Sequence, residues 1–213
     1  MVRLNFEAVR SVLCLGAHAD DIEIGCGGTV LRLLRDRPGL NFVWVVFSAE
    51  GRRTKEAKAS ARVFLKGAGK ARIIIRHFRN GFFPFRGEEI KEFFEKLKGT
   101  VQPDLVFTHY REDRHQDHRV LSDLAWNTFR DHVILEYEIP KYDGDIGNPN
   151  LYVELDEELC HRKIEHACRF FQTQGTKHWF SSDTFLSLMR LRGVECASRT
   201  KYSEAFYCRK LAF

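Results

Sequence analysis

The 213-residue chain carries 34 Lys and Arg against 29 Asp and Glu, which leaves a formal net charge of +5, and 44% of its residues are hydrophobic. This composition is typical of a globular protein and excludes a disordered chain, and we expect one domain over residues 1–213. The mild charge argues against nucleic acid as a partner.

Targeting and redox signals are weak along the whole sequence. Residues 1–10 lack the apolar run of a signal peptide, and no apolar stretch approaches the ~20 residues of a membrane span. The six cysteines form no CxxC pair, so we expect reduced packing residues rather than a disulfide framework or a cysteine zinc site. We therefore expect a cytoplasmic protein without a membrane span.

Short apolar runs between turn residues predict strands, and apolar residues at helical spacing predict helices. In chain order we predict a strand over 11–16, a helix over 30–37, a strand over 42–47, a helix over 54–66, a strand over 73–75, a helix over 88–98, a strand over 104–108, a helix over 118–130, a strand over 133–137, a polar loop over 140–149, a helix over 156–171 and a strand over 202–208. This alternation predicts an α/β fold with a Rossmann-like, mostly parallel sheet and helices on both faces, in a single domain.

A polar cluster, Ala-His-Ala-Asp-Asp at 17–21, follows the first predicted strand. Ligands bind at the carboxyl ends of strands in open α/β sheets. Burying a histidine beside two carboxylates is costly without a partner, and a cation is the simplest one. His18 and Asp21 are three residues apart, share one face of a turn and suit a divalent metal such as zinc, whereas Asp20 points elsewhere.

The glycines at 25, 27 and 28 invite comparison with a dinucleotide-binding fingerprint. That fingerprint requires its GxGxxG immediately after the strand, and here the polar cluster intervenes. We expect instead that these glycines let the backbone turn and open a helix.

A second polar cluster, residues 108–119, follows the predicted strand at 104–108 and can reach the same edge of the sheet. His115 and His118 are three residues apart and can project together from a helix start, while Asp117 can orient an imidazole. We expect His109, which lies nearer the strand, to be a packed residue.

Both clusters resemble motifs of one known family. The sequence at 17–29 is similar to the AHPDD…GxGGT pattern of the LmbE/PIG-L zinc-dependent N-deacetylases, and His-Gln-Asp-His-Arg at 115–119 is similar to their HPDHR. The Ser-Ala-Glu-Gly loop at 48–51 and Tyr-Ser-Glu-Ala-Phe at 202–206, which is similar to the closing YAEAF, extend the resemblance along the chain.

The resemblance implies a Rossmann-like domain that binds one zinc per chain. The residues it assigns are the zinc ligands His18, Asp21 and His118, the general base Asp20, the oxyanion stabiliser or acid His115, and Asp117, which would orient His115. The chain departs from the pattern at Ala19, Ile22 and Gln116, and none of these departures removes a ligand. The neighbouring Glu23 can supply the acid that the family has where Ile22 stands.

The chemistry agrees with this assignment. Zinc on two histidines and a carboxylate keeps an open position and activates water near neutral pH. We therefore predict hydrolysis of an N-acetyl group on an amino sugar in a nucleotide-sugar, glycan or glycoconjugate, and the resemblance alone supplies this substrate class. Arg52 and Arg53 on one rim and Asp113 on another are candidates for sugar contact, and Trp179 is a packing residue or a stacking surface.

Other hypotheses remain open at this point. The chain can be an amidase acting on a non-sugar N-acyl group, or a catalytically silent sugar- or nucleotide-binding domain. A basic nucleic-acid-binding domain is disfavoured, because the charge is modest and the aromatic residues mostly fall at core spacing.

Overall fold

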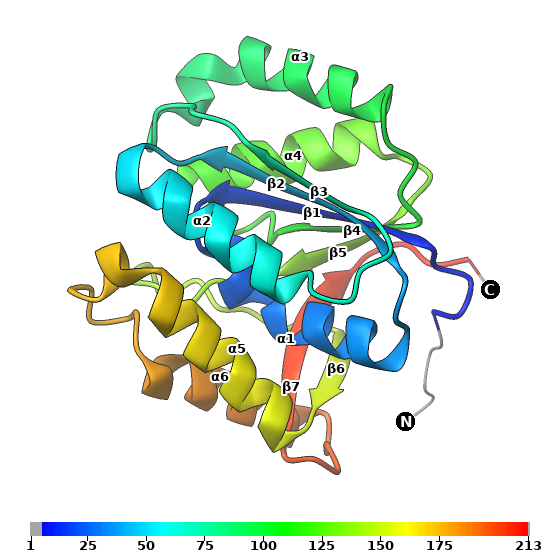
Figure 1. Cartoon of the computed structure of the whole chain (residues 1–213), viewed down its shortest axis with the longest axis vertical. Helices are drawn as coiled ribbons and strands as arrows, with labels where there is room; N and C mark the ends of the chain where they lie inside the picture. Colours follow the sequence, from blue (N-terminus) through cyan, green and yellow to red (C-terminus); the bar gives the residue numbers. More distant parts are fainter. Residues whose placement is uncertain (1–5, 213) are drawn as a thin grey trace.

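A seven-stranded sheet with the order β3-β2-β1-β4-β5-β7-β6 forms the centre of the computed structural model, which describes residues 6–212 (Figure 1). The strands are β1 (Ser11–His18), β2 (Asn41–Ser48), β3 (Ala71–Ile75), β4 (Leu105–His109), β5 (Val133–Tyr137), β6 (Leu151–Leu155) and β7 (Tyr202–Cys208). Strands β1 to β5 pair in parallel, and β7 pairs antiparallel with both β5 and β6. The predicted mostly parallel α/β fold is confirmed. Residues 1–5, part of the segment judged above for a signal peptide, and residue 213 lie outside the description.

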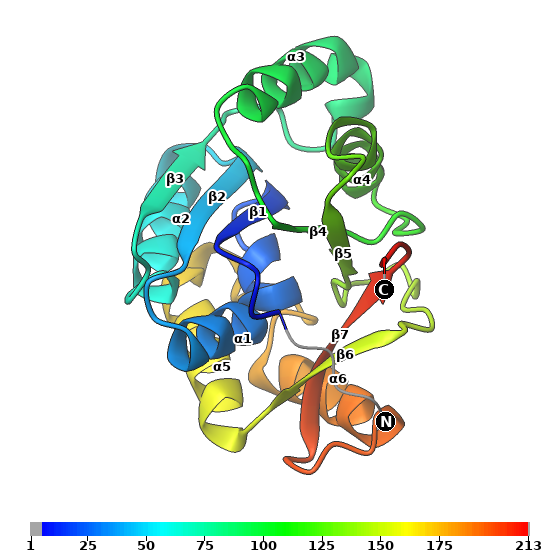
Figure 2. The same cartoon turned by 90° about the vertical axis from the view of Figure 1, so that its right-hand side faces the viewer.

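Helices cover both faces of this sheet (Figure 2). They are α1 (Asp21–Asp36), α2 (Gly51–Phe64), α3 (Gly87–Lys98), α4 (Gln116–Thr128), α5 (Glu157–Phe170) and α6 (Ser182–Glu195), with short 3-10 turns η1 (Phe83–Arg86) and η2 (Gln172–Gln174). Within residues 6–212, no helix is both long and apolar enough to cross a membrane. All six cysteines are free thiols, as expected.

Adjacent residues of the central strands point to opposite faces of the sheet, so each strand serves two cores. In β2, Phe42 and Trp44 pack against the side covered by α1, α2, α5 and α6, whereas Val45 and Phe47 pack against the side covered by α3 and α4. This two-sided burial explains why the parallel strands are continuous apolar runs in the sequence.

Two elements escaped prediction from the sequence, β6 and α6. Helix α6 buries Phe185 and Met189 but leaves Leu191 and Val194 exposed, so its apolar residues follow no single face. Strand β6 is short and pairs only with β7 at the edge of the sheet. Neither element shows a clear period in the sequence, and only tertiary contacts define them.

Helix α1 begins at Asp21, not at Val30 as the glycines led us to expect. The three glycines lie inside the helix, where they allow close packing rather than a turn. A Cβ on Gly25 would lie 2.1 Å from Cδ2 of the buried Tyr137 ring, and one on Gly28 would lie 2.5 Å from Leu155. The early start matters for function, because it places Asp20 and Asp21 at the helix N-terminus.

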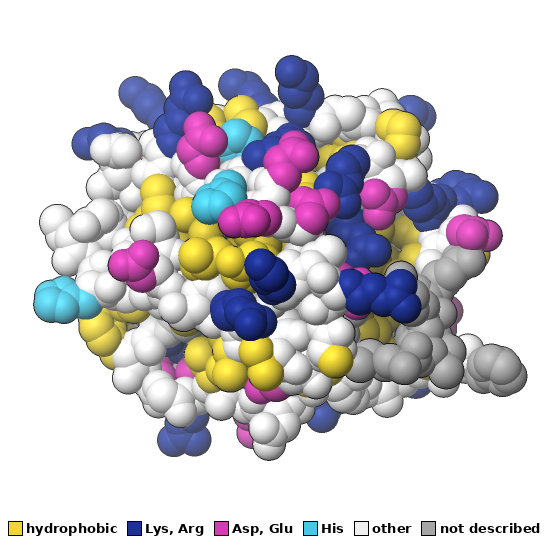
Figure 3. Space-filling model, turned by 90° about the horizontal axis from the view of Figure 1, so that it is seen from below, with side chains coloured by type: hydrophobic (Ala, Val, Ile, Leu, Met, Phe, Trp, Pro, Cys, Tyr) yellow, Lys and Arg dark blue, Asp and Glu magenta, His cyan; other side chains and the backbone are white. Residues whose placement is uncertain are grey.

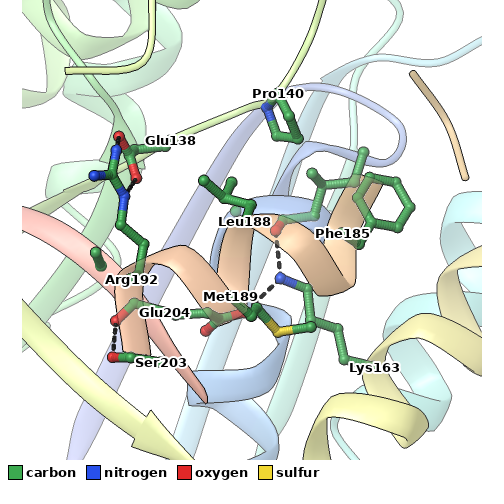
Figure 4. Close-up of a pocket in the computed structure, with 12 residues that line it drawn as sticks. Glu138, Pro140, Lys163, Phe185, Leu188, Met189, Arg192, Ser203 and Glu204 are labelled. Carbon is green, nitrogen blue, oxygen red and sulfur yellow. Dashed lines mark hydrogen bonds and ion pairs between the residues drawn. The ribbon is translucent and has the colours of Figure 1, made fainter. Parts of the chain in front are cut away.

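A buried ion pair fastens α1 to the opposite end of the chain (Figure 4). The Glu204 carboxylate in β7 accepts the backbone N–H groups of Gly28 (2.8 Å) and Thr29 (2.6 Å). The Lys163 ammonium from α5 donates to Glu204 (2.6 Å) and to the carbonyl of Ile24 (2.6 Å). The adjoining cavity of about 20 Å³ holds roughly one water and is too small for a sugar.

Substituting Gly25→Ala tests the packing of α1 on Tyr137. We expect a loss of stability of about 1–3 kcal/mol, because overpacking a rigid core outweighs the small helical preference for alanine. The measurement is urea unfolding followed by circular dichroism. Gly87→Ala, at a helical position where an added Cβ meets nothing within 4 Å, is the matched control and should not lower the midpoint. Equal midpoints for the two variants would contradict the packing argument.

Candidate metal centre and active site

The carboxyl ends of β1 and β4 bring the two polar motifs together. These strands are parallel neighbours, and both end at a histidine, His18 in β1 and His109 in β4. Helix α1 starts just after β1 with Asp21, and α4 starts shortly after β4, with His115 as its N-cap. In Figure 1 this edge is the one toward which the arrow of β1 points.

Three predicted ligand atoms converge at this edge. His18 Nδ1 lies 3.1 Å from His118 Nε2 and 3.3 Å from Asp21 Oδ2, and His118 Nε2 lies 3.6 Å from the same Asp21 oxygen. Ligands bound at about 2.0–2.2 Å around a tetrahedral zinc are about 3.3–3.6 Å apart. The arrangement therefore fits a single small cation.

The outer nitrogen of each of these two histidines faces a buried carboxylate. His18 Nε2 lies 3.2 Å from Asp117 Oδ2, and His118 Nδ1 lies 2.9 Å from Asp113 Oδ2. A carboxylate on one ring nitrogen fixes the proton there and leaves the other nitrogen as a metal ligand. Both lone pairs thus point inward, toward Asp21.

The electrostatics of the cluster also favour a cation. Burial disfavours the charged form of His18, yet Asp21 and Asp117 raise its pKa to about 9. For His118, burial and the neighbouring His109 lower the pKa to about 3, so this imidazole is neutral. Despite burial, His118 and His18 hold the pKa of Asp21 well below its usual range, and it is ionised.

The structure places Asp117 on His18 rather than on His115, which corrects the orientation expected above. Its carboxylate also accepts the backbone N–H groups of Gly81 (2.6 Å) and Phe83 (3.1 Å). The loop after β3 therefore holds the residue that orients a ligand. No sequence motif in that loop predicts this role.

His109 is fully buried, in agreement with the expected packed residue. Its Nε2 accepts the Ala17 N–H at 3.0 Å and lies 3.2 Å from Asp21 Oδ2, so His109, Asp21 and His118 form a second candidate ligand group. His18, His115 and His118 form a third. However, the His109 and His118 rings are stacked at 3.9 Å with an angle of 16°. Lone pairs lie in the ring plane, so parallel stacked rings do not aim at a common ion. We assign His109 to packing behind the ligands.

His115 lies beside the ligands with a definite tautomer. Its Nδ1 accepts the Asp117 backbone N–H at 3.2 Å, which caps α4 and leaves the proton of the neutral ring on Nε2. The ring centroid lies 4.8 Å from that of His18 and 4.6 Å from that of His118. Burial and the charge of His18 lower the pKa of His115, so it is a neutral hydrogen-bond donor.

Asp20 is buried next to the ligand Asp21, and its side chain does not cap α1. Burial and the neighbouring Asp21 raise its pKa, while Arg53 opposes this by pairing with Asp20 Oδ1 at 2.8 Å. Arg52, which we named with Arg53 as a candidate for sugar contact, is 69% exposed and pairs with Glu56. The structure thus brings Arg53, not Arg52, to the site.

Asp113 does not lie on the rim, where the sequence analysis placed it. It is 2% exposed and lies behind His118, where Oδ1 accepts the His115 N–H at 2.8 Å. Lys141, from the loop between β5 and β6, lies 3.0 Å from Asp113 Oδ2. Nothing in the sequence marked Lys141, which sits in a polar loop distant from both motifs.

Trp179 and Glu23 both lie in the protein interior, Trp179 partly and Glu23 fully buried. Trp179 is partly buried and packs against the core on the α5 and α6 side, as a packing residue does. Glu23, the candidate for the acid missing at Ile22, is fully buried near Asp20 and Asp21. Burial raises the pKa of Glu23 well above its usual value.

The charge balance supports a divalent ion in this centre. Four buried carboxylates surround the histidines, and two cationic side chains, Arg53 and Lys141, pair with two of them, namely Asp20 and Asp113. Despite burial, the remaining negative charge raises the pKa of His18 to about 9, and a divalent ion would take the place of the His18 proton. The inner nitrogens of His18 and His118 and the Asp21 carboxylate fit Zn²⁺ in donor type and number. His18, Asp21 and His118 would hold it.

Solved structures with the same fold include a deacetylase and a hydratase. The N,N'-diacetylchitobiose deacetylase from Pyrococcus horikoshii aligns with a TM-score of 0.69 over 96% of this chain and 85% of that one, at 20% identity. GalB, the 4-carboxy-2-hydroxymuconate hydratase from Pseudomonas putida, aligns with a TM-score of 0.74 over 96% and 98%, at 17% identity. These likenesses confirm the fold.

Sequence comparison is more specific. The uncharacterized deacetylase YaiS of Escherichia coli is 30% identical over 142 residues, which are 62% of this chain and 75% of that protein. The family model described as PIG-L, GlcNAc-PI de-N-acetylase, matches residues 13–129, a segment that carries both histidine motifs and every proposed ligand. Since this match covers more than half of the chain, the protein belongs to the PIG-L family.

Proposed function

We propose that this protein is a zinc-dependent hydrolase that removes an N-acetyl group from an amino sugar in a nucleotide-sugar, glycan or glycoconjugate, and that it acts in the cytoplasm. The observation that carries the proposal is the convergence of His18 Nδ1, Asp21 Oδ2 and His118 Nε2 at 3.1–3.6 Å, inside a family of deacetylases. The family description and the deacetylase neighbours support the N-acetyl sugar as substrate class.

The residues around the ligands divide the work of amide hydrolysis. A bound Zn²⁺ would polarise the acetamide carbonyl and lower the pKa of a water to roughly 7. Asp20 accepts the proton of the attacking water and returns it to the amine nitrogen as the C–N bond breaks, and its raised pKa brings its basicity closer to neutral pH. The pair with Arg53 keeps this carboxylate in one orientation.

His115 stabilises the negative charge that forms on the acetamide oxygen during the attack. Its Nε2–H donates to the oxyanion that develops on the acetamide oxygen, and the capped Nδ1 keeps that proton on Nε2. The resemblance left the role of stabiliser or acid open. The cap on Nδ1 and the lowered pKa of His115 favour the stabiliser, because an acid needs the doubly protonated ring.

Three alternatives are disfavoured by particular observations. A silent binding domain does not need ligand atoms placed for a metal together with a separate paired carboxylate at Asp20. A nucleic-acid-binding domain needs a continuous basic face, and the face in Figure 3 carries Asp and Glu among its Lys and Arg. Hydratase chemistry also occurs on this fold, but that neighbour is only 17% identical, and fold alone does not set function.

The first prediction concerns the metal. Wild-type protein dialysed against zinc and then desalted should retain about one zinc per chain, because the candidate ligand groups share His118 and can hold a single ion. His18→Ala should lose this zinc. His109→Gln is the matched control, and should keep it if the stacked His109 is not a ligand. Loss of zinc from His109→Gln and retention by His18→Ala would move the ion to the second candidate group.

The second prediction is the direct test of the function. The zinc-loaded protein should release acetate from at least one member of a panel of N-acetylated amino sugars, free, nucleotide-linked and lipid-linked. Asp20→Asn should keep its zinc and lose about 10²- to 10⁴-fold in turnover, the usual contribution of a general base. Asp21→Ala should lose both zinc and activity. Acetate release only from non-sugar amides, or hydration of an unsaturated acid without acetate release, would contradict the proposal.

The third prediction concerns His115. His115→Ala should lower turnover by roughly 10²-fold or more with little change in zinc content, because it removes an oxyanion donor and no ligand. The proposed role of His115 uses the neutral ring, so His115 does not lose a proton as the pH rises through neutrality. Any fall in rate on the alkaline side of the wild-type rate–pH profile should therefore also be present in the variant. Disappearance of that fall would instead make His115 a general acid.

A further inference from the structure

A buried lysine from the loop between β5 and β6 contacts Asp113, the carboxylate behind His118. The Lys141 side chain is 8% exposed, and its ammonium lies 3.0 Å from Asp113 Oδ2, the oxygen that His118 Nδ1 contacts at 2.9 Å. The same ammonium donates to Asp145, whose carboxylate accepts the Arg114 N–H. Burying an ammonium is costly unless carboxylates pair with it, and Asp113 and Asp145 provide this pairing.

On this basis we propose that Lys141 is a positioning residue that holds Asp113 on His118 and thereby sets the affinity of the centre for zinc. The inference rests on the proposed metal centre. Asp113 has few alternative partners for Oδ2, because the residue is 2% exposed and its Oδ1 already accepts the backbone N–H of His115. Without Lys141, two buried carboxylates would lose their shared cation, and water would have to enter the loop to solvate them.

The direction in which zinc affinity changes when Lys141 is replaced distinguishes a positioning role from a purely electrostatic one. Lys141 is positive, so deleting its charge near a cation should strengthen zinc binding by Coulomb attraction alone. Releasing Asp113 from its fixed place should weaken zinc binding, since removing the partner of a ligating histidine typically costs about 10- to 100-fold in metal affinity. We expect the second effect to dominate, at about 10-fold for this more distant residue.

The experiment measures zinc affinity by competition with a chromophoric chelator, which is independent of enzyme activity. Lys141→Met should bind zinc about 10-fold more weakly than wild type, while Lys141→Arg, which keeps the charge and the donors, should remain close to wild type. In an Asp113→Asn background, adding Lys141→Met should cause little further loss, because the two residues act through one contact. Unchanged or tighter zinc binding by Lys141→Met would overturn the proposal.

A matched control distinguishes this contact from general anchoring of the loop. Arg192 is also buried and holds the same loop, through Glu138 at 2.6 Å (Figure 4) and through the carbonyl of Gly147 at 2.9 Å. Arg192→Met should lower the unfolding midpoint without weakening zinc. An equal loss of zinc affinity in Arg192→Met and Lys141→Met overturns the specific role of Lys141. Failure of wild type to bind zinc overturns the metal centre itself, and with it the proposed function.

Discussion

Excess negative charge at the carboxyl ends of β1 and β4 is the constraint on which the site depends. Carboxylates buried together are costly unless cations or hydrogen-bond donors compensate them. Arg53 and Lys141 compensate two of the four, and backbone N–H groups of the loop after β3 compensate Asp117. Within residues 6–212, the partners of Asp21 are neighbouring histidines and the His18 N–H, and the divalent cation that we propose here would complete the balance.

Residues far from the motifs keep the ligands in place. Glu204 and Lys163 fasten α1, whose first residue is the ligand Asp21, to β7 and α5. The Gly81 and Phe83 amides hold Asp117, which in turn orients His18. Each ligand therefore has a partner that fixes its direction, and precise placement of this kind is what metal sites require. Such partners come from the whole chain, so the site is a property of the complete sheet.

Fold and function separate clearly in this protein. A deacetylase and a hydratase share its architecture at similar TM-scores, so the sheet alone decides nothing about the reaction. The family match across residues 13–129 and the three convergent ligand atoms are specific to the site. The cap on His115 Nδ1 and the Arg53 pair on Asp20 fix the side chains that we propose as oxyanion donor and general base.

The sequence by itself determined the alternating α/β fold and the motif residues, because both depend on local spacing: apolar periodicity defines strands and helices, and neighbouring polar residues share a strand end. It did not determine which carboxylate meets which histidine. In the structure the Asp117 carboxylate contacts His18, Asp113 is buried behind His118 instead of lying on the rim, and Arg53 pairs with Asp20. The role of Lys141 likewise appears only in three dimensions. Such pairings join loops distant in sequence, and their geometry is decided by how helices and loops pack around the sheet, which no local pattern records.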